Sequence, residues 1–213
     1  MDIHGSSPPQ CGNHLSEQAR SDTALLGRVQ LQWLKRELQR SRATWKIISS
    51  DMRLALLVRD GQDSQNRSRF EAVANGDGPV LGREFEIANL LKFLKRKRVN
   101  NVVWLTADMR DCAVHYYDPD SAVFSDFQPF WEFVAGPLHA GTFGPNELDH
   151  IFGPQVVFQQ APAEGESNLP PSAGMHFFWQ VDIDYQTKEL PIAFRNRAGQ
   201  ELYTQTLGPE DDR

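Results

Sequence analysis

The sequence predicts an α/β fold, in which amphipathic helices cover a buried sheet and antiparallel strands close the domain. Two segments with helical periodicity are each followed by a short apolar run, which is typical of buried parallel strands. The C-terminal part instead alternates apolar and polar residues, as half-buried strands do. With 213 residues, 40% of them apolar, the chain is long enough to bury a sizeable core.

The first helix is predicted within residues 22–43. Residues 1–23 are polar and turn-rich without a hydrophobic period, so we interpret them as a loose lead-in. Asp22 or Thr23 would cap the helix that follows. Its apolar residues form two neighbouring rows at helical spacing, Leu26, Val29 and Trp33 on one and Leu31, Leu34 and Leu38 on the next.

Strands and a second helix follow in alternation. Residues 44–52 predict a short buried strand, which we extend through the apolar residues 54–58. The polar stretch 59–69 predicts a surface loop. Residues 81–99 predict a second amphipathic helix, and residues 101–108 a second buried strand. Helix, strand, loop, helix and strand in this order are half of a layered α/β architecture.

Both predicted strands end in an aspartate, Asp51 and Asp108. If the strands are parallel neighbours, their carboxyl ends meet at one edge of the sheet, where α/β proteins gather their ligands. The sequence therefore places a candidate site at this edge.

The character of the chain changes after residue 120. Residues 124–154 are dense in aromatics, Gly and Pro, and predict an ordered irregular segment packed on a core. Residues 176–184, 190–194 and 201–207 then predict an antiparallel meander. Residues 209–213 read as an acidic, solvated tail, so the domain spans residues 24–208.

Composition excludes several classes of protein. The net charge of −6 disfavours a nucleic-acid or anionic-membrane surface. The basic residues within 92–98 lie at a predicted helix end, where they complement the helix dipole. No apolar run is long enough to cross a bilayer, and the N-terminus lacks the regions of a secretion signal, so the chain as written is expected in the cytoplasm. Cys11 and Cys112 form no CxxC motif.

The stretch around Asp108 carries the residues best suited to chemistry. Asp108 would bind a metal, act as a base or cap the next turn. His115, set among aromatics, is more often a hydrogen-bonded packing residue than a catalyst. Asp111 and Cys112 would complete a metal site with these two only if the fold brings all four together, and their spacing does not select that arrangement.

Other candidates are weaker. Residues 12–14 (GNH) are similar to a metal-binding loop of binuclear phosphoesterases, but no apolar strand precedes them, and we interpret the match as coincidental. His139 would line a pocket mouth or serve the packing. No GxSxG, P-loop, HExxH or dinucleotide fingerprint occurs.

Five stretches together resemble the PhoD-like alkaline phosphatases. They are ALLGRVQLQWLKRELQRSRATWKIISSDM, FEAVANGDGPVLGREFEIANLLKFLK, NVVWLTADM followed by AVHYYDP, PFWEFVAGPLHAGTFGPNELDHIFGPQVVFQ, and FFWQVDID. The resemblance covers about residues 20–208, in order. It implies the C-terminal part of a layered α/β/β/α metallophosphoesterase-like sandwich.

The resemblance also implies an activity. Members of the family hydrolyse phosphomonoesters and phosphodiesters, bind Ca²⁺ with iron, and are usually exported. Two hard cations clamp phosphate oxygens and lower the pKa of a metal-bound oxygen nucleophile. Asp108 takes the place of a metal ligand in the family's strand-end motif Ala-Asp-Val-His.

The chain departs from the family at this motif, which here reads Ala107-Asp108-Met109-Arg110. A guanidinium is permanently charged and has only donors, so Arg110 cannot ligate a cation and would instead hold a phosphate. The family's proline after the first strand is Arg53 here. The family's N-terminal domain and its early metal ligands have no counterpart in this sequence.

These observations predict a PhoD-like phosphoesterase acting on small phosphate esters, with Asp108 as metal ligand and Arg110 and His115 beside the phosphate. Because metal ligands of the family are replaced or missing here, we expect the chain as written to be a truncated phosphatase with impaired activity. The alternative is a catalytically inactive fragment, or a phosphate-binding module that needs a partner, through self-association or another chain, to complete its fold.

Overall fold

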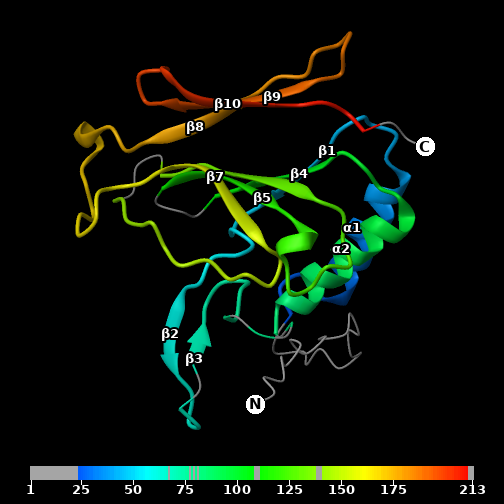
Figure 1. Cartoon of the computed structure of the whole chain (residues 1–213), viewed down its shortest axis with the longest axis horizontal. Helices are drawn as coiled ribbons and strands as arrows, with labels where there is room; N and C mark the ends of the chain where they lie inside the picture. The colour runs from blue at the N-terminus through cyan, green and yellow to red at the C-terminus, as the bar shows by residue number, and fades with distance from the viewer. Residues whose placement is uncertain are drawn as a thin grey trace, which may run out of the picture.

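The computed structural model describes residues 24–66, 68–76, 78, 80, 82–107, 111–137 and 141–210. Over these residues the chain forms three layers, which Figure 1 shows from the helices at the lower right to the antiparallel strands at the top. Two helices pack on one face of a five-stranded sheet, and a three-stranded sheet packs on the other. The α/β prediction is confirmed at this level, and the described residues contain one helical layer.

The central sheet is mixed, with the strand order β1-β4-β6-β5-β7. Its strands are β1 (Lys46–Ser50), β4 (Val102–Thr106), β6 (Phe130–Val134), β5 (Cys112–Tyr117) and β7 (Pro154–Gln160). β1, β4 and β6 are parallel, and β5 is antiparallel to both β6 and β7. The expected parallel pair is confirmed, because Ser50 lies opposite Thr106.

The helices α1 (Gly27–Arg40) and α2 (Glu84–Lys97) cover one face of this sheet. Their apolar residues form one cluster with alternate residues of the strands, among them Ile48, Trp104 and Phe130. The basic last turn of α2 is confirmed at the helix end, where it complements the dipole.

The opposite face carries the antiparallel meander β8 (Phe177–Val181), β9 (Leu190–Asn196) and β10 (Glu201–Leu207). Phe194 of β9 is fully buried against Phe133 of β6, with ring centroids 6.2 Å apart. The predicted meander is confirmed. Two 3₁₀ turns, Pro119–Ser121 and Pro171–Ala173, lie in the connections.

The prediction of an irregular segment over residues 124–154 is wrong in its centre. Residues 130–134 form β6, which pairs with β4 on one side and β5 on the other. The strand could not be recognised in the sequence FWEFV, because Glu132 interrupts an apolar run and several Gly-Pro pairs, typical of turns, follow it. Tertiary contacts make the burial of Glu132 tolerable, as described below.

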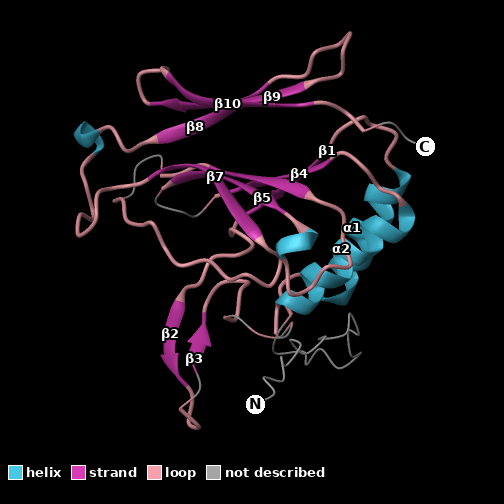
Figure 2. Ribbon diagram, viewed as in Figure 1, coloured by secondary structure: helices cyan, strands magenta, loops and turns pink. Residues whose placement is uncertain are grey.

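The two predictions after β1 are also wrong. Residues 54–58 do not extend the strand; they leave the sheet and bond instead to residues 147–149, through Leu57 N–H to Glu147 O at 3.1 Å and Asp149 N–H to Ala55 O at 2.8 Å. The polar stretch 59–69 contains β2 (Arg59–Gln62) and β3 (Ser68–Phe70), an exposed hairpin that projects from the body in Figure 2.

Helix α1 begins at Gly27 and its N-cap is Leu26, so the prediction of Asp22 or Thr23 as the cap is wrong; those two residues lie outside the described ranges. The carboxylate of Glu86 in α2 accepts the backbone N–H groups of residues 25, 26 and 27 at 2.9, 2.6 and 3.0 Å. The buried row of α1 is Leu31, Lys35 and Leu38, while Val29 and Trp33 of the other predicted row are exposed.

Candidate functional site

The predicted site lies where β1 and β4 end side by side. The backbone N–H of Ala107 donates to Asp51 O at 3.1 Å, so the two strand ends stay joined beyond the last ladder pair. The side chain of Asp51 is exposed at this edge. Asp108 and Arg110 come next in the chain and lie outside the described residues, so their predicted roles stay predictions.

A buried ion pair follows at the start of β5. Nη2 of Arg53 lies 3.1 Å from Oδ1 of Asp111, and both side chains are fully buried. The second oxygen of Asp111 accepts from Nε2 of Gln159 at 2.8 Å. Nε and Nη1 of Arg53 meet no acceptor within the part of the chain that the structure describes. Arg53 therefore anchors Asp111, the residue that follows the strand-end motif.

Glu132 is the centre of a second buried polar group, on the helix-facing side of the sheet. Its Oε1 accepts from the backbone of Leu54 at 2.9 Å and from Oγ1 of Thr106 at 3.0 Å. Its Oε2 accepts from the hydroxyl of Tyr117 at 2.6 Å and lies 3.2 Å from Nδ1 of His115. We call these five residues the Glu132 cluster. Four donors converge on one carboxylate, which is the arrangement that a buried charge requires.

The surroundings of the Glu132 cluster keep the proton on the tyrosine rather than on the acid. Burial raises the pKa of Glu132, but the hydrogen bond and charge of His115, with Tyr117 and Arg53, lower that pKa below its ordinary value. Burial first, and then the charge of Glu132, hold the pKa of Tyr117 well above its usual range. Glu132 is therefore an ionised acceptor.

His115 is placed inside this cluster rather than on an open surface. Its side chain is fully buried, and since Glu132 has no proton to give, Nδ1 of the imidazole donates. Nε2 of His115 is buried without a hydrogen-bond partner among the described residues. The contacts that the structure gives His115 are those of a packing residue, and a catalytic role for it stays a prediction.

The structure does not bring His115, Asp111 and Cys112 together. β5 turns successive side chains to opposite faces, so Cys112 packs under the meander while His115 faces the helices. Asp111 is engaged by Arg53 and Gln159. Burial, followed by the charge of Asp111, raises the pKa of the Cys112 thiol, which makes it a poor ligand.

The described residues do not fit a binuclear metal centre. Among them, no group of three or more His, Cys, Asp or Glu side chains is arranged to hold a metal ion. The buried carboxylates of Asp111 and Glu132 are both committed to protein donors. Arg53 adds a positive charge at the same edge, which disfavours a cation.

The remaining candidates lie elsewhere. Residues 12–14 and His139 are outside the described residues, and His150 is exposed. The sequence analysis missed Glu132, although an acid in the middle of the apolar run FWEFV was a signal of a buried polar group. It also missed His176, which is 3% exposed with neither ring nitrogen bonded within the described structure.

Comparison with known proteins decides the family. The family model of the PhoD-like phosphatases matches residues 5–194. The chain belongs to the PhoD-like phosphatase family. This confirms the resemblance drawn from the sequence. A search of curated proteins found no match.

Among solved structures, the chain is similar to one described as "Structure of PhoD", at 25% identity and a TM-score of 0.38. That match covers 57% of this chain and 22% of the other. The match thus spans less than a quarter of the length of that protein. In the described part of this family member, no helix is both long and apolar enough to span a membrane.

Proposed function

We propose that this PhoD-like chain supplies part of a phosphoesterase site, where a phosphomonoester or phosphodiester is held at the carboxyl ends of β1 and β4. Membership of the family supports the reaction class. The observation that supports the location is the hydrogen bond from Ala107 N–H to Asp51 O, because the Ala-Asp-Met-Arg motif begins at Ala107 and parallel strands present ligand-binding groups at this edge of a sheet.

Each residue of the motif has a distinct proposed role. Asp108 is the metal ligand that the family resemblance implies, and Arg110 holds the phosphate oxygens through paired N–H donors. The Arg53–Asp111 pair positions the chain on the far side of the motif. His115 acts on the phosphate only indirectly, through the Glu132 cluster, because its imidazole is fully buried.

The proposed metal binding depends on Asp108, which lies outside the described residues. Ca²⁺ with iron is the pair that the resemblance implies, and the described side chains do not fit it. The proposed contacts of Arg110 to phosphate need no metal, because its charge is permanent.

A second candidate function follows from the poor fit between the described side chains and the metals that the family resemblance implies. A chain with an arginine in the motif, and no metal group among its described residues, would bind a phosphate ester without hydrolysing it, or would hydrolyse it only after association with a partner. Under both of these alternatives, we expect the chain on its own to show no phosphoesterase activity.

The test is an assay of the purified chain with a chromogenic phosphomonoester and a chromogenic phosphodiester, with Ca²⁺ and iron supplied. We expect weak turnover that Asp108→Asn abolishes together with the bound metal, and that Arg110→His increases. Asp120→Asn is the matched control, since Asp120 is exposed in a connection away from the strand ends, and it should leave turnover and metal content unchanged.

The other results separate the alternatives. A folded chain without turnover that still binds inorganic phosphate, and loses that binding in Arg110→Gln, would replace the hydrolase by the binding module. Turnover that survives Asp108→Asn would contradict the proposed site. Activity that appears only at high protein concentration would favour self-association.

A further inference from the structure

A cleft lies at the opposite end of the central sheet from the strand-end edge where β1 and β4 finish. It has a volume of about 400 Å³ and opens where β4 and β6 begin and β5 ends, beneath the C-terminal residues 205–210. This volume is within the roughly 300–1,000 Å³ of small-molecule sites. The cleft is lined by the first residues of β4, Val102–Trp104, whereas the strand-end motif follows its last residue, Thr106, so the two are at opposite ends of the strand.

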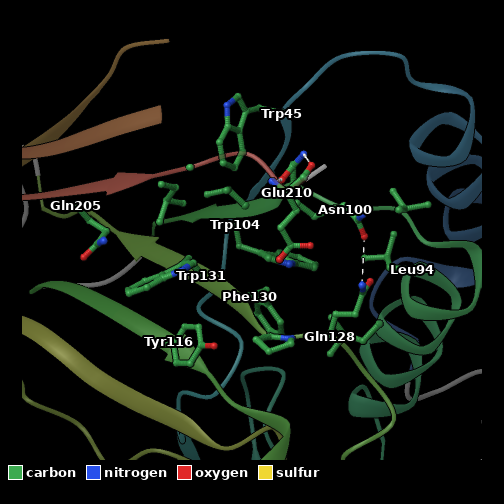
Figure 3. A pocket seen from close by; sticks show the side chains of 18 of the residues that line it. Trp45, Leu94, Asn100, Trp104, Tyr116, Gln128, Phe130, Trp131, Gln205 and Glu210 are labelled. Atoms are coloured by element: carbon green, nitrogen blue, oxygen red, sulfur yellow. Dashed lines mark hydrogen bonds between the residues drawn. The ribbon is translucent and has the colours of Figure 1, made fainter. Parts of the chain in front are cut away.

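One end of the cleft is an aromatic wall. Tyr116 of β5 lies opposite Trp131 of β6, and their ring centroids are 4.9 Å apart at an angle of 50°. Both side chains are half-buried and reach the cleft side by side in Figure 3. Trp104 lies further in, next to Phe130 at 6.3 Å between ring centroids. Such faces bury large apolar area with little loss of side-chain entropy.

The other end carries polar groups with unused hydrogen-bonding capacity. Nε2 of Gln128 donates to Oδ1 of Asn100 at 3.2 Å, drawn as a dashed line in Figure 3. No hydrogen bond within the described residues uses Nδ2 of Asn100 or Oε1 of Gln128. Trp104 is 2% exposed, and its buried Nε1–H meets no acceptor in the described chain. The cleft thus offers both donors and acceptors.

The charge of the cleft disfavours an anion. Among the described residues that line it, Glu210 is the only charged one, and none is a lysine, arginine or histidine. Burial, and then the negative charges of Asp118 and Glu210, raise the pKa of Tyr116, which is consistent with a negative potential at the aromatic wall. A phosphate group would therefore be repelled, whereas a neutral ligand would not.

We propose that this cleft binds a neutral sugar unit. Hydroxyl groups both donate and accept, and can therefore satisfy Trp104 Nε1–H, the Asn100 amide nitrogen and the Gln128 amide oxygen together. The C–H face of the sugar packs on the exposed faces of Tyr116 and Trp131. These two rings are tilted and contact each other, so they do not form the pair of parallel faces between which a nucleobase would be sandwiched.

The test uses the five tryptophans of the chain as reporters. Neutral mono- and disaccharides are titrated into the ¹⁵N-labelled full chain while the indole N–H signals are followed, with Trp104→Phe and Trp131→Phe assigning two of them. We expect saturable shifts of the Trp104 and Trp131 signals, with a dissociation constant on the order of 1 mM, and no shift of Trp33 or Trp179. Trp33 lies on α1 and Trp179 on β8, and neither lines the cleft.

Two variants make the proposal falsifiable. Gln128→Leu should weaken binding about tenfold, the equivalent of one hydrogen bond. Gln65→Leu, in the exposed connection between β2 and β3, should bind as the unaltered chain does; circular dichroism verifies that both are folded. Absence of saturable shifts up to the solubility of the sugars would overturn the proposal. So would preferential binding of nucleosides, or a Gln128→Leu variant that binds with unchanged affinity.

Discussion

Glu132 shows how one residue governs both the fold and the environment of the predicted site. It occupies the middle strand position between β4 and β5, where an apolar residue would ordinarily sit. Its carboxylate instead joins the connection after β1, through Leu54, to two neighbouring strands of the sheet: β4 through Thr106, and β5 through His115 and Tyr117. A buried carboxylate that accepts from four donors holds a single arrangement, because any shift leaves one of these buried groups unpaired.

Replacing this carboxylate by an amide should destabilise the chain. In Glu132→Gln the amide nitrogen would face the donors of Tyr117 and His115, so we expect a loss of about 2–4 kcal/mol in the free energy of unfolding, measured by urea denaturation. Glu37→Gln is the control, because Glu37 pairs only with exposed Arg36; it should cost under about 0.5 kcal/mol.

The same substitution should alter the acid side of the stability curve. The folded-state pKa of Glu132 is below its ordinary value of 4.5. Its contribution to stability is therefore complete above pH 4.5 and is lost as the pH falls through the folded pKa. The stability difference between the unaltered chain and Glu132→Gln should narrow below that pH. Parallel curves would show that another group is responsible.

At the scale of elements, α1 depends on α2 for its N-terminus. A helix leaves its first N–H groups without intrahelical partners. The N-cap residue Leu26 supplies no side-chain acceptor. Glu86 of the neighbouring helix, 8% exposed, accepts the N–H of the first helical residue, Gly27, and those of Leu25 and Leu26 just before it. Lys35 of α1 also donates to Asn89 of α2, so the two helices are joined by polar contacts as well as by their apolar rows.

Glu86→Gln should loosen this junction. Loss of the negative charge weakens the three charge-assisted bonds and the interaction with the helix dipole, for which we expect about 1–2 kcal/mol. Hydrogen exchange of the amides of residues 25–27 should accelerate, while that of β4 should follow global stability alone. In the exposed control Glu71→Gln, exchange at α1 should be unchanged. Unaltered exchange in Glu86→Gln would show that α1 is held by packing alone.

At the scale of the whole molecule, two apolar clusters share one sheet. The helix-side cluster contains Trp104 and the meander-side cluster contains Val103 and Leu105, all from β4. Because neighbouring residues of one strand belong to opposite clusters, neither can be lost without disturbing the other. Residues 24–208 are therefore expected to unfold as one cooperative unit.

Phe194→Ala tests this cooperativity. The ring is fully buried between the meander and the central sheet, and its removal should cost about 3–5 kcal/mol in global stability. Fluorescence and far-ultraviolet circular dichroism should report one coincident transition. Phe178→Ala, on the 41% exposed neighbour in β8, should cost under about 1 kcal/mol. Separate transitions would show that the meander folds as an independent layer.

Much of the fold followed from local pattern. The amphipathic rows predicted both helices, and the apolar runs predicted β1 and β4, because periodicity records which face is buried. β6 escaped prediction because its buried acid is compensated by residues far apart in the chain, Leu54 and His115. Residues 54–58 were taken for a strand because an apolar run does not reveal which backbone partners it meets.

For the site, the sequence by itself determined the family, through its long motifs, and the edge at which Asp51 and Ala107 meet. Only the tertiary structure decided that His115 is enclosed by Glu132 and that Arg53 pairs with Asp111. It also decided that aromatic and amide side chains surround a cleft at the other end of the strands. The physical reason is one of range: periodicity and motifs record local geometry, whereas hydrogen-bond partners of buried polar groups are set by contacts between segments distant in sequence.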